Sequence, residues 1–177
     1  MGRSSKGDSQ AFTILYDRYA GKMINYFARM LWNDREKATD LTQDLFTKII
    51  NKPELYRTGS KFSTWIYSIA SNMCKNEYRH HEVKDRHAVG VQAAYMERAR
   101  PTASNMDHLD FKNSLDDELS KLEHPQRSTF IMRYKQGLSI KDIADVMNCS
   151  EGTVKSRLFY TAKKLAKQLS HFDPKNT

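Results

Sequence analysis

The segment of residues 147–159, MNCSEGTVKSRLF, carries side chains that suit a groove of nucleic acid or an acidic surface. Hydroxyls and cations can bind the acceptor atoms on base edges, and an aromatic ring can contact a thymine methyl group. Lys163, Lys164 and Lys167 follow at positions from which they can reach phosphates. The candidate base-reading residues are Thr153, Lys155, Ser156 and Phe159.

A helix-turn-helix is the element expected to position these side chains, because two short helical patterns flank the sequence MNCS. Ser150 can cap the second helix through its hydroxyl, and Val154 and Leu158 then recur one turn apart on its buried face. Small Ala144 lies where the first helix would cross the second closely. In this motif the second helix enters the major groove with its N-terminal residues toward the bases. A solvated basic helix that closes a small bundle is the structural alternative.

The segment before this motif is expected to complete a small C-terminal helical domain. Leucines recur at helical spacing after Phe111, and Pro125 suits the first turn of the next helix. Gly137 can end that helix in a left-handed conformation. Ser139 and Asp142 then form a variant capping box at the start of the helix that precedes MNCS.

The N-terminal half shows three amphipathic patterns that predict three helices around one core. Asp8 can cap the first helix, and Ser60 can cap the third. The second helix is expected over about residues 34–51, after a variant capping box formed by Asn33 and Glu36. No strand-like alternation bounded by hairpin signals is present, so the predicted fold class is all-α.

Between these halves the periodicity weakens, and the sequence predicts two small helical domains joined by a linker. The expected boundaries are residues 1–85 for the first domain, 86–110 for the linker, 111–172 for the second domain and 173–177 for a tail. Within the linker, AVGVQAAYMERA is compatible with a short helix and equally with a segment that docks on something else.

Charge and hydropathy restrict the compartment and the partner. The chain has 177 residues and a formal net charge of +8, which favours a polyanionic partner, with nucleic acid first and a membrane surface second. The start MGRSSKGDSQ lacks the apolar run of a signal peptide, and no later stretch is apolar enough to cross a bilayer. We therefore expect a cytoplasmic protein without membrane insertion.

Metal, cofactor and catalytic chemistry find little support in the sequence. Cys74 and Cys149 form no CxxC pair, and Cys74 and His80 lack a usual ligand spacing, so we expect no metal site and no cofactor. Neither a phosphate-cradling glycine loop nor an arranged nucleophile, base and acid is visible, which argues against an enzyme. A nuclease would need clustered carboxylates, but the adjacent acids at residues 116–118 point in different directions on a helix.

Four stretches of the sequence, read together, resemble the extracytoplasmic function (ECF) group of bacterial RNA polymerase sigma factors, within the sigma-70 family. They are GDSQAFTILYDRY, DLTQDLFTKII, KFSTWIYSIASNMCKNEYR and LSIKDIADVMNCSEGTVKSRLFYTAKKLAKQL. The resemblance implies that the first domain is sigma region 2 and the second is sigma region 4. It also implies that the chain binds core RNA polymerase and directs initiation at promoters with minus-ten and minus-thirty-five elements.

The resemblance implies that the helix containing DLTQDLF docks on the polymerase. Leu41 and Phe46 are adequately explained as core residues, whereas exposed acids on the same helix can pair with basic polymerase side chains. A preference for acids in the N-terminal half of a helix is the alternative explanation. The matching polymerase-binding residues are Asp40, Leu41, Gln43, Asp44 and Phe46.

The resemblance also places minus-ten recognition on the loop of residues 55–60 and on the helix that follows it. Promoter melting requires a protein that holds an unstacked base and its neighbouring phosphates, which suits an aromatic and amide-rich basic helix. Trp65 is either a core residue or a DNA-facing one, since it shares the apolar stripe with Phe62. The matching minus-ten residues are Lys61, Trp65, Asn72, Lys75, Asn76 and Arg79.

Minus-thirty-five recognition is implied for the second helix of the helix-turn-helix, with two departures from the family pattern. Lys155 occupies a position often filled by Arg, so a point charge replaces bidentate recognition of guanine. Tyr160 stands where a further basic residue is common. The matching residues are Thr153, Lys155, Ser156, Arg157, Phe159 and Lys163.

Three questions stay open at the level of sequence. A helix-turn-helix regulator that binds operator DNA without polymerase is the alternative function. Many relatives are held inactive by an anti-sigma factor, and the resemblance raises this hypothesis for the present chain. A compact, self-occluded chain and an open pair of domains on a flexible linker are equally compatible with the sequence.

Overall fold

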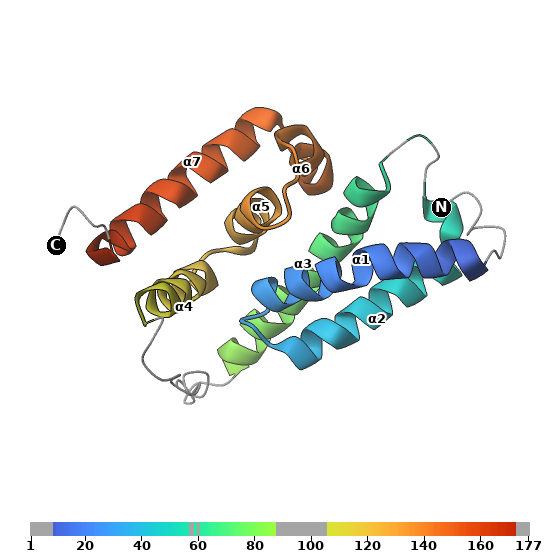
Figure 1. Cartoon of the computed structure of the whole chain (residues 1–177), viewed down its shortest axis with the longest axis horizontal. Coiled ribbons are helices and arrows are strands. Elements are labelled where there is room, and N and C mark those ends of the chain that lie inside the picture. The colour runs from blue at the N-terminus through green and yellow to red at the C-terminus, as the bar shows by residue number, and fades with distance from the viewer. Residues whose placement is uncertain (1–8, 57–58, 60, 88–105, 173–177) are drawn as a thin grey trace.

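A computed structural model describes residues 9–56, 59, 61–87 and 106–172, and its described residues form helices and turns without a strand (Figure 1). The all-α prediction is therefore confirmed. The expected caps at Asp8 and Ser60 and the linker segment AVGVQAAYMERA lie outside the described residues. The helices are α1 (Ser9–Met30), α2 (Arg35–Asn51), α3 (Phe62–His87), α4 (Met106–Ser120), α5 (His124–Tyr134), α6 (Ile140–Met147) and α7 (Glu151–Gln168), with short 3-10 turns η2 (Pro53–Leu55) and η3 (Ser170–Phe172).

The helices α1, α2 and α3 form an N-terminal unit around one apolar core. Met23, Tyr26 and Phe27 of α1 are fully buried, and they meet Leu45 of α2 and Ile66 of α3 in the same cluster. These residues recur at three- and four-residue intervals within their helices, so each helix turns one apolar stripe inward. The opposite face of α2 is left in solvent.

The start of α2 differs from the expected capping box. Asp34 is the N-cap, and its Oδ1 accepts a hydrogen bond from the backbone N–H of Lys37 at 3.0 Å. Trp32 and Asn33 have positive φ angles of 53° and 62°, so both residues turn the chain after α1. The expected cap at Asn33 was wrong because this two-residue left-handed turn moves the cap position one residue along the chain, to Asp34.

The C-terminal unit consists of α4, α5, α6 and α7. The residues predicted to start α5 and α6 and to follow the end of α5 are confirmed. Pro125 lies in the first turn of α5, and Gly137 has a φ of 72° beyond the end of that helix. Ser139 Oγ accepts the N–H of Asp142 at 3.0 Å and donates to its carboxylate at 2.7 Å. These contacts fix the start of α6 and therefore the entry into the helix-turn-helix.

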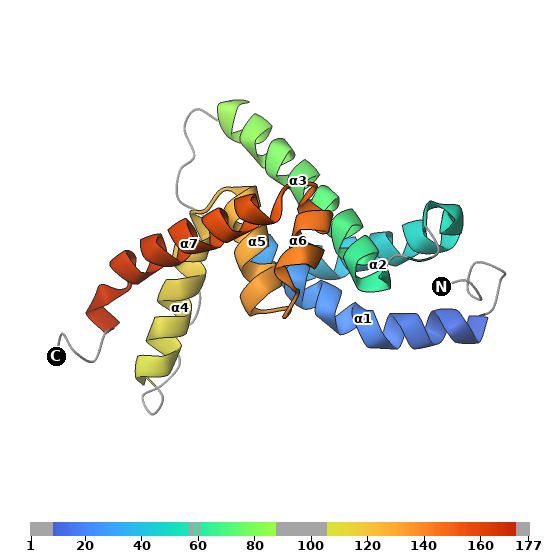
Figure 2. The same ribbon diagram turned by 90° about the horizontal axis from the view of Figure 1, so that it is seen from above.

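The two units pack against each other in a closed arrangement (Figures 1 and 2). The helix α6 lies on α3, and α5 lies on α1 and α3, so one apolar cluster extends through both units. The Tyr26 and Ser128 hydroxyls are hydrogen bonded at 2.7 Å, and Tyr67 donates to Gln136 at 2.7 Å. Of the two arrangements compatible with the sequence, the structure has the compact one.

Arg127 is a buried cation at this junction. Its side chain belongs to α5, and the residue is only 2% exposed. Its Nη1 donates to the Tyr78 hydroxyl at 3.0 Å, and that hydroxyl donates to the Met30 carbonyl at 3.0 Å. The guanidinium carbon lies 5.8 Å from the centroid of the Trp32 ring, within the range of a cation–π interaction. The contact thus joins α5 to the C-terminal end of α1 and to Tyr78 within α3.

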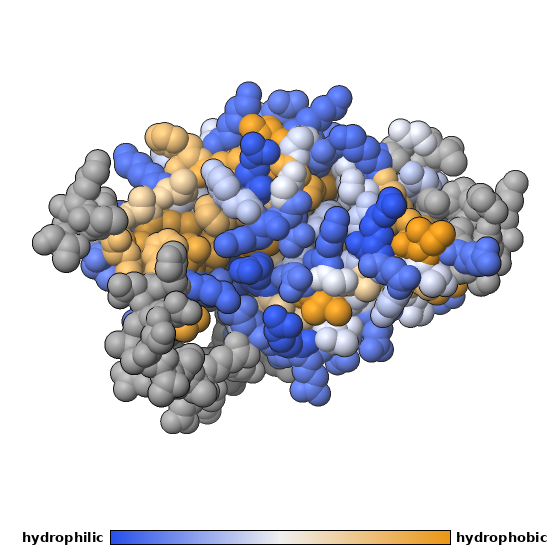
Figure 3. Space-filling view, in the orientation of Figure 1, coloured by the Kyte–Doolittle hydropathy of each residue, from blue (hydrophilic) through white to orange (hydrophobic). Residues whose placement is uncertain are grey.

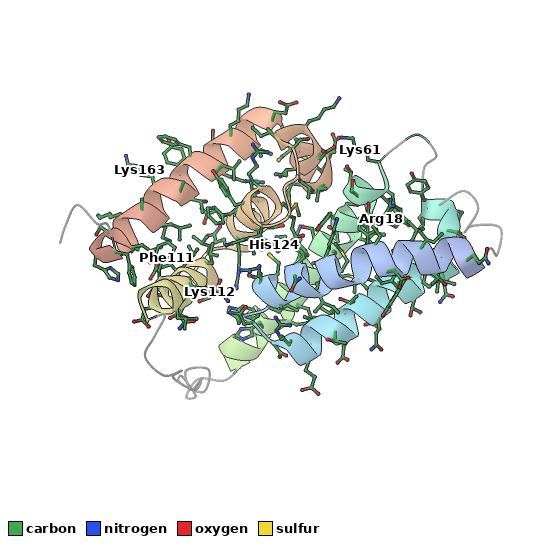
Figure 4. The ribbon with its side chains drawn as sticks, viewed as in Figure 1. Arg18, Lys61, Phe111, Lys112, His124 and Lys163 are labelled. Carbon is green, nitrogen blue, oxygen red and sulfur yellow. The ribbon has the colours of Figure 1, made fainter. Side chains whose placement is uncertain are left out.

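His124, at the start of α5, lies at the same junction (Figure 4). Its Nε2 donates to the Ser71 carbonyl at 3.1 Å, and the Tyr78 ring lies against it. Burial lowers the pKa of His124 to about 4, although the Ser71 bond opposes the shift, and the charges of Lys75 and Arg157 lower the pKa further. The closed arrangement therefore holds a neutral imidazole.

Acidification is expected to weaken the closed arrangement through this imidazole. Because the pKa of His124 is lowered below its usual value of 6.5, its contribution is complete well above pH 6.5 and is lost as the pH falls toward 4. We expect the wild-type chain to lose at most about 2 kcal/mol of unfolding free energy from this group between pH 8 and pH 5. Denaturant unfolding at several pH values measures the loss.

The matched variant for this measurement is His124→Gln, which keeps an N–H donor for the Ser71 carbonyl and does not titrate. The difference in unfolding free energy between variant and wild type should change over the same pH interval. Parallel pH profiles for the two chains would contradict the assignment to His124.

Candidate nucleic-acid and polymerase interfaces

The helix α7 presents the predicted base-reading residues along its exposed side. Lys155, Ser156 and Lys163 are exposed, and Phe159 is 63% exposed despite its large apolar ring. Figure 4 shows Lys163 on the outer side of α7. Opposite them, Val154 and Leu158 are buried, so the helix turns its polar and aromatic face outward.

Two other predicted residues of α7 are half-buried and support the turn before the helix. Thr153 is hydrogen bonded through its hydroxyl to Ser150 at 3.0 Å. Arg157 places Nη1 3.7 Å from the Cys149 sulfur. These contacts tie the start of α7 to the turn, so both side chains are positioned before any partner binds.

The N-cap of α7 fixes the start of the recognition surface. Ser150 Oγ accepts the N–H of Thr153 at 3.1 Å, as predicted from the sequence. We expect Ser150→Ala to lower the free energy of unfolding by about 1 kcal/mol, because one N–H at the helix start loses its partner. Denaturant unfolding measures the change, and Ser156→Ala is the control because it removes an exposed serine hydroxyl from the same helix. Equal effects of the two substitutions would contradict the capping role.

The helix α3 carries an exposed polar stripe formed by four of the predicted minus-ten residues. Their spacing of three and four residues places them on one helix face. All four are exposed, whereas Met73 and Cys74 between them point into the core. The stripe combines amides with cations, which suits contacts to bases and phosphates. Its members are Asn72, Lys75, Asn76 and Arg79.

The remaining two minus-ten candidates, Trp65 and Lys61, lie outside this stripe and contact other side chains. Trp65 is partly buried, and its ring packs on Tyr56 at 5.2 Å and on Phe62 at 5.7 Å between centroids. Lys61, just before α3, is exposed, and its Nζ lies 2.9 Å from a carboxylate oxygen of Asp142 on α6 (Figure 4). Trp65 thus contributes to packing while keeping part of its surface in solvent.

The predicted polymerase-binding residues divide between the two faces of α2. Asp40, Gln43 and Asp44 are exposed, whereas Leu41 and Phe46 are only 7% and 3% exposed. The Phe46 ring packs against aromatic rings in the first turns of α1. The two apolar residues therefore hold α2 in place, and the acids and the amide form its free face.

The sequence did not predict that Thr64 and Asp142 contact each other across the junction between the units. Thr64 of α3 donates its hydroxyl to Asp142 Oδ1 at 3.4 Å, beside the contact from Lys61. The bond from Ser139 and the nearby Lys61 ammonium lower the pKa of Asp142. A capping box was the only role that local spacing suggested for Asp142, because its partners on α3 are distant in the sequence.

The surface is largely hydrophilic in the view of Figure 3, with apolar residues gathered where α4 faces α7. Leu119, Leu122 and Leu165 form a second small core there, separate from the main cluster. Within the described parts of the chain, no helix is long and apolar enough to span a membrane. The same residues contain no group of three or more His, Cys, Asp or Glu side chains placed to hold a metal ion.

Family comparisons match the two units separately. Residues 15–83 match the family Sigma-70 region 2, and residues 112–165 match Sigma-70, region 4. The first match covers most of α1, α2 and α3, and the second covers most of α4 to α7.

Individual proteins match over nearly the whole chain. The ECF RNA polymerase sigma-E factor of Haemophilus influenzae is 30% identical over 165 residues, which cover 89% of this chain and 86% of the relative. The ECF RNA polymerase sigma factor SigW of Bacillus subtilis is 29% identical over 173 residues, with coverage of 93% and 91%.

Among solved structures, the sigma factor RpoE in complex with the anti-sigma factor NepR from Bartonella quintana has a similar fold. Its TM-score is 0.71 at 23% identity, and the match covers 91% of this chain and 98% of that chain. The two region matches occur in the same order as the two units, and the relatives match over most of the length of both chains. The chain belongs to the ECF group of RNA polymerase sigma factors in the sigma-70 family.

Proposed function

We propose that this sigma factor directs promoter-specific transcription initiation by using α2 to dock on core RNA polymerase and α3 and α7 to contact promoter DNA. The observation that carries the proposal is the presence of two separate exposed basic faces, one in each unit. A single operator-binding helix would need only one of them. The boundaries proposed for the region 2 unit, the linker and the region 4 unit are residues 1–85, 86–110 and 111–172.

Minus-thirty-five recognition is assigned to the exposed face of α7. Its N-terminal turns carry Lys155, Ser156 and Phe159 in solvent, ahead of Lys163. The Lys155 ammonium can donate to guanine acceptors, and the Phe159 ring offers an apolar surface to a thymine methyl group. Lys163 lies two turns further along, where a cation suits the phosphate backbone.

Minus-ten recognition is assigned to α3 and the residues just before it. The exposed amides of Asn72 and Asn76 can bond to the edges of unpaired bases, while Lys75 and Arg79 neutralise phosphates. Trp65 keeps part of its ring in solvent next to Tyr56, which provides an aromatic surface for an unstacked base.

Polymerase docking is assigned to the acidic face of α2. Asp40, Gln43 and Asp44 lie on one exposed side of a helix that is anchored by buried apolar residues. Rim charges of this kind set partner orientation and the rate of association. A complementary basic surface on the polymerase is the expected counterpart.

Sigma factors as a class are initiation factors without enzymatic activity, and we assign no catalytic activity to this chain. We place its action in the cytoplasm, where polymerase and promoter DNA are present. An anti-sigma partner is part of the proposal, since the fold is shared with a sigma factor solved in complex with one.

Dependence on polymerase separates this proposal from a stand-alone regulator. Tagged chain is incubated with fragmented genomic DNA at about 0.15 M salt, with and without core polymerase, and the retained fragments are sequenced. The proposal expects enrichment of fragments with a shared two-element motif only when core polymerase is present. Equal enrichment of a single motif by the chain alone would contradict it.

A further inference from the structure

The two most exposed large apolar side chains of the described residues are neighbours on α7. Tyr160 is 66% exposed, and Phe159 is 63% exposed. Their ring centroids lie 5.3 Å apart, and the rings meet edge to face at 79°. Phe159 belongs to the face assigned above to the minus-thirty-five element. Because the rings adjoin, they form one apolar surface, unlike apolar side chains that are scattered singly over a protein.

The fold does not account for the Tyr160 ring. Val154, Leu158 and Leu165 recur at helical spacing and turn one side of α7 into the protein. Successive residues of a helix point about 100° apart, so Tyr160 points away from that buried side. Its ring is therefore available to a partner of α7.

The helical period places the two rings on opposite flanks of the outward face of α7. Ser156 and Lys163 lie near the midline of that face, and both are exposed. From this midline Phe159 lies about 50° to one side and Tyr160 about 50° to the other. A helix with its side chains nearly fills the major groove, which is about 12 Å wide. When the midline faces the floor of the groove, each ring faces a different strand.

The chemistry around the rings favours thymine-bearing duplex DNA. The thymine methyl is the apolar group that base edges present in the major groove. Exposed cations surround the rings on the same helix, and their charge complements the phosphates of a duplex. These cations are Lys155, Lys163 and Lys164. An apolar surface set among cations therefore fits this DNA better than an apolar protein surface.

We propose that Tyr160 is a specificity-determining residue, and that Phe159 and Tyr160 contact thymine methyl groups on opposite strands of the minus-thirty-five element. The inference rests on the proposed function. It follows that α7 selects an element with thymine on both strands. The contact is made by ring carbon atoms, so it does not depend on the Tyr160 hydroxyl.

Removal of single methyl groups from the DNA tests the inference. Starts mapped with core polymerase first define the minus-thirty-five element. Each thymine of that element is then replaced in turn by deoxyuridine, which lacks only the methyl group. Binding of each promoter fragment is compared for polymerase that carries the wild-type chain, Tyr160→Ala or Phe159→Ala. Tyr160→Phe keeps the ring, and Tyr134→Ala removes an exposed tyrosine ring from α5, so both serve as controls.

We expect the wild-type complex to lose about fourfold in affinity for one replacement on each strand, as expected for burial of one methyl group. Tyr160→Ala should be insensitive to the replacement on one strand, and Phe159→Ala to the replacement on the other. Both controls should keep both losses. Full sensitivity of Tyr160→Ala to every replacement, or an element that lacks thymine on one strand, would overturn the inference.

Core binding separates failure of this inference from failure of the proposed function. If the wild-type chain with core polymerase selects no two-element promoter, the function itself is wrong. If Tyr160→Ala instead loses affinity for core polymerase, the ring docks on polymerase and the inference is overturned. Because the Tyr160 ring is exposed, Tyr160→Ala should unfold at the same denaturant concentration as the wild-type chain, which excludes misfolding as the cause of a loss.

Discussion

An Asp44→Arg chain is expected to lose at least about 100-fold in affinity for core polymerase, and with it nearly all transcription from every promoter. Asp44 is exposed on the face of α2 assigned to docking, and a reversed charge there would meet a basic partner surface. Like charges placed together at an interface cost several kcal/mol, which corresponds to this loss. Core binding is measured with labelled chain, and transcription is measured from a two-element promoter.

The control for this substitution is Asp117→Arg, which makes the same charge change on the exposed side of α4. It should leave core binding within about twofold, because a surface charge outside the docking face is lightly coupled to it. Asp44 lies on a solvent-facing side, so its replacement should also leave the unfolding transition nearly unchanged. Comparable losses from both substitutions would contradict a docking role for α2.

A Lys155→Ala chain is expected to lose about tenfold in initiation from promoters that carry the upstream element, with core binding unchanged. Lys155 is exposed on the N-terminal part of α7, where a recognition helix meets base edges. Loss of one base contact costs about 1–3 kcal/mol. Because lysine is a point charge and not a bidentate donor, we expect a cost near the lower end of this range. Initiation is compared on promoters with the intact and with a scrambled upstream element.

The result that identifies a base contact is a smaller preference for the intact over the scrambled upstream element, and not only weaker initiation. If Lys155 reads a base, the variant should discriminate less between intact and scrambled elements. Lys112→Ala removes the same charge from the exposed surface of α4 and should preserve that discrimination (Figure 4). An equal loss on both promoters for Lys155→Ala would identify the residue as a phosphate contact instead.

The sequence predicted the helix starts at which a cap residue bonds to a backbone N–H a few residues further along. Ser139 and Ser150 each sit three residues before the N–H that they accept, so spacing alone identifies both caps. The start of α2 was misassigned because Trp32 and Asn33 adopt left-handed conformations, which side-chain type predicts poorly outside glycine. Caps are thus predictable where the preceding backbone is ordinary.

Periodicity predicted the exposure of the candidate site residues, whose choice came from the family resemblance, but it did not predict the junction between the units. An apolar stripe identifies Tyr26 as buried, yet its bond partner Ser128 is 102 residues away. Polar residues such as Thr64 and Asp142 give no pattern that pairs them across the chain. Closure therefore depends on long-range complementarity, which local sequence rules do not describe.

The most direct test of the sigma-factor account is transcription by sigma-free core polymerase from the chain's own source, with starts mapped across a genomic promoter library. The account predicts discrete starts only when the chain is added, each downstream of one shared pair of minus-ten and minus-thirty-five motifs. An absence of core binding and of new starts, together with specific binding of an operator by the chain alone, would contradict it.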